Sequence, residues 1–165
     1  MVEAMVVHAT DQVRRLFYRP VEAVFSALSD REKLRTWYDS GSSSDVSDVD
    51  VDFNLGGRKR VVYKFRPGTP MAGKTLVNEE RFLNIVPNRR IVTSSIMTME
   101  GEPFSVSLIT FELAPSGPGS ELTVTHQDAF FENADGPEMR KAGWNALMEW
   151  LGKVVETADA AQLTH

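Results

Sequence analysis

The sequence contains no cysteine, so disulfide bonds, thiolate catalysis and cysteine-ligated metal sites are excluded. The three histidines lie far apart at His8, His126 and His165, a spacing that favours no metal site. No apolar run approaches the roughly 18 residues of a membrane span. The first residues also lack the basic and apolar segments of a signal peptide. We therefore expect a cytoplasmic protein with no metal, no other cofactor and no membrane partner.

Basic charge is also scarce. Lysine and arginine number 18 against 23 aspartates and glutamates, which gives a formal net charge of −5. Nucleic acids and anionic membranes attract proteins through basic patches. The tight basic clusters here are Arg58–Arg60 and Arg89–Arg90, and each lies beside a turn signal. We interpret both clusters as solvated strand ends and expect no nucleic-acid partner.

The chain length and composition indicate one globular domain. The 165 residues, with 42% hydrophobic and 25% charged residues, suit a single domain with a sizeable core. No internal repeat or linker interrupts the pattern. We predict one domain over residues 11–158, with terminal arms at residues 1–10 and 159–165.

The C-terminal segment 135–158 has the spacing of one long amphipathic helix. Asp135 can cap this helix, and Pro137 suits its first turn. The apolar stripe of the helix comprises Trp144, Leu147, Met148, Leu151, Val154, Val155 and Ala158. The opposite face, expected to meet solvent, comprises Asn145, Glu149, Gly152, Lys153 and Glu156. Such a stripe requires a long apolar partner, and the strand-rich middle of the chain is the candidate.

The rest of the chain alternates apolar and polar residues between turns rich in glycine and proline, which predicts strands. The expected strands are residues 12–18, 48–53, 59–66, 74–85, 90–99, 104–113 and 121–128. Two short helices are expected after the first strand. One begins at Pro20, and the other begins at a capping box formed by Ser29 and Glu32. Short turns between successive strands predict an antiparallel meander of the α+β class.

Several segments resemble one known superfamily. Residues 19–34, ending at Trp37, are similar to the opening motif of the START-like SRPBCC superfamily, and most closely to homologues of the activator of the heat-shock protein 90 ATPase. Further similar segments are Gly56–Gly57, residues 73–93, residues 121–126, and Gly143–Trp144 with Leu147 and Leu151. The resemblance covers nearly the whole chain after residue 10. It implies a helix-grip fold, as in pollen allergens, in which a curved seven-stranded antiparallel sheet wraps the long helix and leaves a cavity.

The residue patterns, together with the cavity that the resemblance implies, predict which side chains meet a ligand. The expected contacts are Trp37, Phe53, Tyr63, Ser95, Met97, Phe104, His126, Arg140, Trp144 and Met148. Ser94–Ser95 replaces the aromatic residues often found in the family, which indicates a roomier or more polar wall. Alternation does not decide which face of residues 93–99 points inward.

Two of these residues have more than one interpretation. His126 alternates with Leu122 and Val124, so it lies on the apolar face of the last strand, where it could act as an acid or base, bind a ligand, or bond within the core. Arg140 precedes Trp144 by one turn, where it could meet an anionic ligand group or pair with a carboxylate.

Three functions follow from these features. The chain could bind a small hydrophobic or amphipathic molecule, act as a polyketide-cyclase or aromatase with His126 as acid or base, or regulate a chaperone ATPase through protein contact. A homodimer is a further alternative. His126 is the one clear candidate for titration near neutral pH, so we expect no catalytic residue and favour ligand binding.

Overall fold

The computed structural model describes residues 5–38 and 44–163, with side chains described for these residues except 37, 44–47 and 157–163. Its elements are, in chain order, β1 (Val7–Phe17), α1 (Val21–Ser29), α2 (Arg31–Tyr38), β2 (Ser44–Val51), β3 (Arg58–Phe65), β4 (Thr75–Val86), β5 (Arg90–Met99), β6 (Glu102–Ser116), β7 (Gly119–Phe130) and α3 (Pro137–Leu163). The predicted order of one strand, two helices, six strands and a long helix is confirmed.

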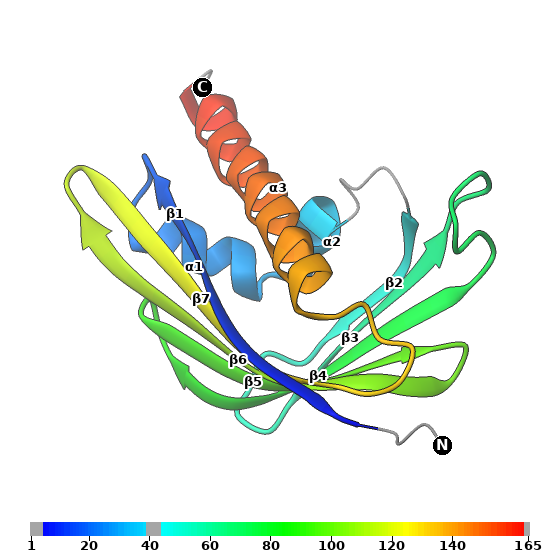
Figure 1. Cartoon of the computed structure of the whole chain (residues 1–165). Helices are drawn as coiled ribbons and strands as arrows, with labels where there is room; N and C mark the ends of the chain where they lie inside the picture. The colour runs from blue at the N-terminus through cyan, green and yellow to red at the C-terminus, as the bar shows by residue number, and fades with distance from the viewer. Residues whose placement is uncertain (1–4, 39–43, 164–165) are drawn as a thin grey trace.

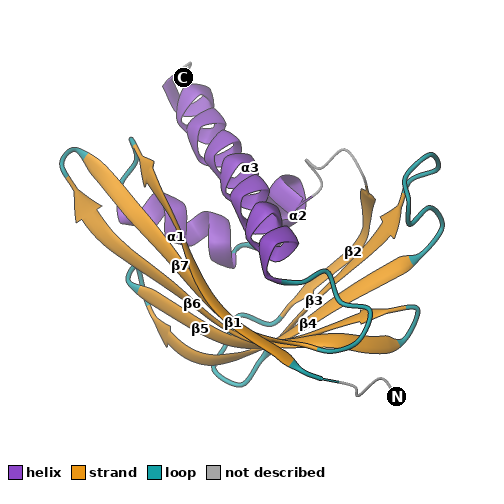
Figure 2. Cartoon of the chain, in the orientation of Figure 1, coloured by secondary structure: helices purple, strands orange, loops and turns teal. Residues whose placement is uncertain are grey.

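The strands form one antiparallel sheet in the order β1-β7-β6-β5-β4-β3-β2. The sheet curves, and α3 runs across its concave side with α1 and α2 on the same side (Figures 1 and 2). Register shifts interrupt the β4–β5 pairing between Phe82 and Asn84, and the β5–β6 pairing between Met97 and Thr98. Such bulges bend and twist strands, so they help the sheet to curve. The predicted helix-grip architecture is confirmed.

The hydrophobic core lies where α3 crosses the sheet. On α3, Trp144, Met148, Leu151 and Val155 are at most 8% exposed, as the apolar stripe predicts. These side chains share one core cluster with inward-facing residues of the strands and of both short helices. The long helix is therefore the element around which the core is organised.

The sheet and the long helix both extend beyond their predicted bounds. β1 begins at Val7 rather than at residue 12, and Val7 pairs with Phe130 of β7, so residues 7–10 belong to the sheet rather than to a terminal arm. The alternation in this segment is weak because β1 is an edge strand that exposes most of its first residues. α3 continues to Leu163, past the predicted end at residue 158.

The cap of α2 differs from the prediction. The carboxylate of Asp30 accepts a hydrogen bond from the backbone N–H of Lys33 at 3.0 Å, so Asp30 caps the helix. The hydroxyl of Ser29 instead donates back to the carbonyl oxygen of Phe25 at 2.9 Å, within α1. The expected capping box of Ser29 and Glu32 is wrong, because α1 extends through Ser29 and α2 begins at Arg31, directly after Asp30.

Two expectations for α3 are also wrong. Asp135 does not cap the helix, which begins at Pro137; its carboxylate pairs with the side chain of Arg140. Gly152, expected on the solvent face, is buried against β1, where the guanidinium of Arg15 occupies the space that a side chain would need. Glycine at this position therefore lets the edge strand approach the helix.

The burial of Leu151 gives a direct test of the helix phase. Leu151 is 1% exposed in the core cluster, so Leu151→Ala should lower the free energy of unfolding by ~2–5 kcal/mol. Lys153→Ala is the matched control, because Lys153 is exposed on the same helix and should change stability by less than ~0.5 kcal/mol. Urea denaturation measures both. A loss below ~1 kcal/mol for Leu151→Ala would contradict the packing described here.

Candidate functional site

A cavity of about 240 Å³ lies between the N-terminal half of α3 and the concave face of the sheet. Its walls are mostly aromatic and aliphatic, and five polar or charged side chains reach it from both sides. The lining residues are Tyr38, Tyr63, Phe65, Leu76, Asn78, Ser95, Met97, Ser107, Ile109, Asp135, Met139, Arg140, Gly143, Trp144, Leu147 and Trp150. Ligand sites commonly combine such apolar walls with a few polar groups.

Small side chains on the sheet create this space. Ser95 on β5 and Ser107 on β6 point to the concave side, and they are 2% and 5% exposed. Ile109 and Phe111 follow Ser107 on the same face of β6 and fill the core further along the strand. A buried serine occupies much less volume than these residues, so the helix and sheet remain apart at the serine positions.

Arg140 organises the polar group at one side of the cavity. Its Nε and Nη2 atoms donate to the two carboxylate oxygens of Asp135, each at 2.8 Å. Nη2 also donates to the hydroxyl of Ser105 at 2.7 Å, and Nη1 donates to Ser107 at 3.3 Å. The guanidinium additionally lies 4.9 Å from the ring centroid of Phe130. Arg140 thus ties the start of α3 to the middle of β6.

A buried carboxylate lies behind this group. Asp128 accepts a hydrogen bond from Ser107 at 2.5 Å, is 2.6 Å from Nδ1 of His126, and is 3.6 Å from Nη1 of Arg140. Burial by itself raises the pKa of Asp128, but the hydrogen bonds from His126 and Ser107 and the charges of His126 and Arg140 outweigh it and hold the pKa below its usual range. Asp128 is therefore a weak base.

His126 is packed under the helix rather than into the cavity. Its ring is 1% exposed and stacks on Trp144, with centroids 5.8 Å apart and an interplanar angle of 23°. Because Nδ1 faces Asp128, Nε2 is the remaining polar atom, and it has no hydrogen-bond partner among the described residues. The imidazole therefore supports Trp144 and Asp128 but does not line the cavity.

A second polar group lies at the opposite wall. Nζ of Lys59 is 2.9 Å from Glu80 and donates to the hydroxyl oxygen of Tyr38 at 3.2 Å. Glu80 also accepts hydrogen bonds from Thr93 at 2.7 Å and from Asn78 at 3.0 Å. Lys59 and Glu80 are almost fully buried, so their opposite charges and these hydrogen bonds compensate for the lost hydration.

Two tyrosines connect this second group to the cavity. The rings of Tyr38 and Tyr63 meet edge to face, with centroids 6.0 Å apart. Burial is the main cause that raises the pKa of both phenols well above the usual value, with the nearby charge of Glu80 as a further cause. Both phenols therefore stay protonated at neutral pH and can act as hydrogen-bond donors.

The structure brings together half of the residues predicted to contact a ligand. Tyr63, Ser95, Met97, Arg140 and Trp144 line the cavity.

Four of the others do not line the cavity, and His126 is one of them. Phe53 packs between Phe25 and Phe82, with ring centroids 5.7 Å and 5.0 Å away, and Met148 is buried in the core cluster. Phe104 is buried on β6 but is not part of the lining. The side chain of Trp37 lies outside the described residues.

Several lining residues were not predicted from the sequence. Asp135 was assigned to a helix cap, and Asn78 and Ser107 were treated as ordinary strand residues. A signal for Ser107 does exist, because Ser105 and Ser107 alternate with outward-facing residues on the same face as Ile109. Serines at apolar positions of a strand indicate either a polar network or a cavity wall.

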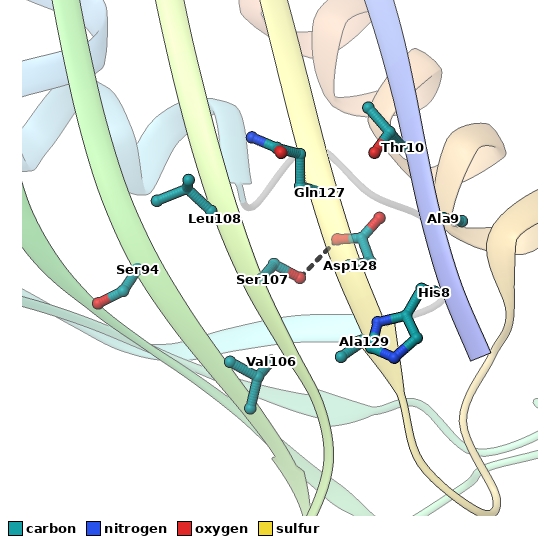
Figure 3. A pocket seen from close by; sticks show the side chains of 10 residues that line it. All are labelled: His8, Ala9, Thr10, Ser94, Val106, Ser107, Leu108, Gln127, Asp128 and Ala129. Carbon is teal, nitrogen blue, oxygen red and sulfur yellow. Dashed lines mark hydrogen bonds between the residues drawn. The ribbon is translucent and has the colours of Figure 1, made fainter. Parts of the chain in front are cut away.

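A second, larger hollow of about 600 Å³ lies on the outer face of the sheet. Figure 3 shows it across β1, β7, β6 and β5, with short side chains such as Ser94 and Ala129 at its rim and the helices behind the sheet. The apolar side chains Val106 and Leu108 are 39% and 38% exposed there. This hollow lies on one face of the sheet, whereas the cavity beneath α3 lies between the helix and the sheet.

The described residues add two findings. No helix within residues 5–38 and 44–163 is long and apolar enough to span a membrane. Within the same residues, no cluster of three or more histidine, aspartate or glutamate side chains could hold a metal ion.

Comparisons with known proteins agree with this architecture. The family model described as Activator of Hsp90 ATPase homolog 1-like protein matches residues 18–156. An uncharacterised protein from Rhizobium leguminosarum is similar in structure, with a TM-score of 0.86, 24% identity, and coverage of 94% of this chain and 99% of that chain. The Mll3558 protein from Rhizobium loti has a TM-score of 0.78 and 35% identity, with coverage of 91% and 99%.

A third similar structure carries the family description in its name. The AHSA1-like protein from Aeromonas hydrophila has a TM-score of 0.69 and 18% identity, over 92% of this chain and 94% of that chain. A search of curated proteins finds no match.

The lowered pKa of Asp128 predicts a specific pH dependence. A carboxylate whose pKa is lower in the folded state than its unfolded value of about 3.9 stabilises the fold above that value, and this contribution is lost as pH falls through the folded pKa. Asp128→Asn should therefore cost about 1.5–3 kcal/mol at pH 7, and the difference from wild type should shrink at pH 3. Urea denaturation at both pH values measures this.

The control is Asp50→Asn, because Asp50 is exposed on β2 and pairs only loosely with Arg58, at 3.8 Å. It should change neither the stability nor its pH dependence appreciably. An Asp128→Asn variant that is as stable as wild type at pH 7 would show that the buried network contributes nothing.

Proposed function

Because the chain belongs to the family of Activator of Hsp90 ATPase homolog 1-like proteins, we propose that it uses the cavity beneath α3 to bind a small amphipathic molecule. The observation that carries the proposal is an apolar space with one polar group where α3 meets β6 and another on β3 and β4. Trp144, Met97 and Leu147 supply apolar surface, while Arg140 and Asn78 belong to the two polar groups.

The volume limits the size of the ligand. A non-hydrogen atom in a condensed phase takes roughly 20–30 Å³, so about 240 Å³ accommodates roughly 8–12 such atoms. This size suits a substituted aromatic ring or a short branched chain. It argues against a sterol or a long-chain lipid, unless the helix moves away from the sheet.

The polar lining favours a ligand with hydrogen-bonding groups. The hydroxyl of Ser95 donates to Asn78 at 2.6 Å, which leaves its oxygen lone pairs for a ligand donor. The hydroxyl of Tyr63 makes no hydrogen bond within the described part of the chain, although its ring lines the cavity. A ligand hydroxyl or amine could hydrogen-bond to this phenol, which a purely apolar ligand could not.

A catalytic role for His126 has little support. His126 does not line the cavity, and Trp144 stacks on its ring. Ser107 does line it, but its hydroxyl proton points at Asp128, whose lowered pKa makes it a poor base for activating a nucleophile. Neither His126 nor Ser107 therefore offers a ligand in the cavity an activated acid, base or nucleophile.

A protein-binding role is the second candidate, because the outer face of the sheet carries exposed apolar side chains. Val106 and Leu108 are 39% and 38% exposed in the hollow of Figure 3, and Ile96, which pairs with Val106 across β5 and β6, is 47% exposed. Contiguous apolar surface of this kind can mark a protein contact. If the protein acts only through such a protein contact, the cavity takes up no ligand. A test of ligand uptake therefore separates the ligand-binding role from the protein-binding role.

Gly143 offers a test that leaves the core intact. It lies on α3 at the cavity wall, and a Cβ atom added there would meet no atom within 4 Å. Gly143→Phe should therefore place a ring in the cavity and reduce the affinity for a small probe, 4-ethylphenol, by at least about tenfold, because about 8–12 atoms already fill the space. Ligand-observed NMR titration measures the affinity.

The matched control is Gly143→Ala, which adds one methyl group and should bind the probe nearly as well as wild type. Both variants remove a glycine from a helix and should be at least as stable as wild type, by about 0.5–1 kcal/mol for alanine. If wild type does not take up 4-ethylphenol, or Gly143→Phe binds it equally well, the cavity is not the site and the protein-binding role gains support.

A further inference from the structure

Arg140 is the one basic side chain among the described residues that line the cavity, and its N–H groups are already committed. Nε and Nη2 donate to both oxygens of Asp135 at 2.8 Å, and Nη2 also bonds to Ser105. Nη1 faces Ser107 at 3.3 Å and Asp128 at 3.6 Å. A ligand carboxylate could reach this guanidinium only by displacing the carboxylate of Asp135. It would also have to approach the buried carboxylate of Asp128.

The opposite wall offers an anion no better partner. Lys59 is 4–5% exposed, and its ammonium group lies 2.9 Å from Glu80 and bonds to Tyr38. Among the described residues, these contacts place two cations and three carboxylates in or beside the lining: Arg140, Lys59, Asp128, Asp135 and Glu80. Asp128 also bonds to His126, whose ring does not line the cavity.

Aromatic rings near the cavity already make cation–π contacts with Lys59 and Arg140. The ammonium group of Lys59 lies 5.5 Å from the ring centroid of Tyr38, and the guanidinium of Arg140 lies 4.9 Å from that of Phe130. The cavity presents further rings from Trp144 and Trp150. Aromatic faces attract cations, most strongly when water is excluded, as in sites for quaternary ammonium groups.

We propose that the cavity selects small organic cations over organic anions, and that Asp135 sets this preference by neutralising Arg140. The inference rests on the proposed function, because it names the class of molecule that the cavity takes. Asp135 suits this role because its side chain lines the cavity and is 26% exposed. Its carboxylate can therefore contact a ligand while it is paired with Arg140. A carboxylate ligand would meet like charge at the same place, which opposes binding.

Three probes of similar size and different charge test the proposal. They are benzyltrimethylammonium, the neutral isostere neopentylbenzene and the anion 3-phenylpropanoate. Binding of all three probes is measured by ligand-observed NMR at the same near-neutral pH, where 3-phenylpropanoate is ionised. Wild type should bind the cation at least about tenfold more tightly than the anion, with the neutral probe detectably bound.

Two variants should shift the ratio of cation to anion affinity in opposite directions. Asp135→Asn removes the carboxylate that occupies Arg140, so the ratio should fall by about tenfold or more as the guanidinium becomes available to 3-phenylpropanoate. Arg140→Gln leaves Asp135 without its cation, so the ratio should rise. The ratio is measured within each protein, and thermal melts confirm that each variant is folded under the conditions used.

The outcomes separate this proposal from the function on which it rests. Neopentylbenzene binding without any preference for benzyltrimethylammonium over 3-phenylpropanoate would overturn the charge selection and leave the proposed function standing. An unchanged ratio in folded Asp135→Asn would overturn the role of Asp135. If none of the three probes binds to wild type, the proposed function fails and the charge selection fails with it.

Discussion

A single helix cannot fill the concave side of a seven-stranded sheet, and the rest of this structure follows from that mismatch. Six strand spacings of about 4.8 Å make a sheet roughly 29 Å wide, whereas a helix with its side chains is about 10–12 Å across. Curvature reduces the difference, and α1 and α2 cover part of the remaining surface (Figure 2). The space left over lies under the N-terminal half of α3.

The side chains around this space decide whether it collapses. Leu151 and Val155 seal the C-terminal part of the interface, where large residues of helix and sheet interdigitate. Toward the start of α3, Ser95 and Ser107 leave volume that no core residue fills. Arg140 then spans from the helix to β6 through hydrogen bonds, so polar contacts rather than apolar packing hold this end of the helix on the sheet.

The sequence predicted the fold well because its strongest signals are periodic. The stripe from Trp144 to Val155 and the alternation of β7 both describe a face that is buried along its length. The edge strand β1 was predicted less well, because its first residues are solvated on both faces and carry no period. The cap of α2 failed for a different reason, since Ser29 and Asp30 are both good capping residues and only the backbone turn decides between them.

The site was predicted only in part. A cavity forms where inward-facing side chains of the helix and the sheet do not touch one another, and the sequence does not show which side chains these are. Tyr63 and Phe53 have the same character in the sequence, yet Tyr63 faces the cavity while Phe53 packs between two other phenylalanines. His126 was placed correctly on the inward face, but no local pattern could reveal that Trp144 would stack on it. The pairing of Arg140 with Asp135 was one of the open alternatives, and it changes the charge that a ligand would meet.

The central claim is that a small molecule binds inside the grip, and the methionine methyl groups test it most directly. Met97 and Met139 line the cavity, whereas Met148 lies on the same helix as Met139 but is 5% exposed in the core. Carbon-13 NMR of methyl-labelled methionine during titration with 4-ethylphenol should shift the Met97 and Met139 signals and leave that of Met148 nearly unchanged. Saturable binding that shifts neither Met97 nor Met139 would contradict the account.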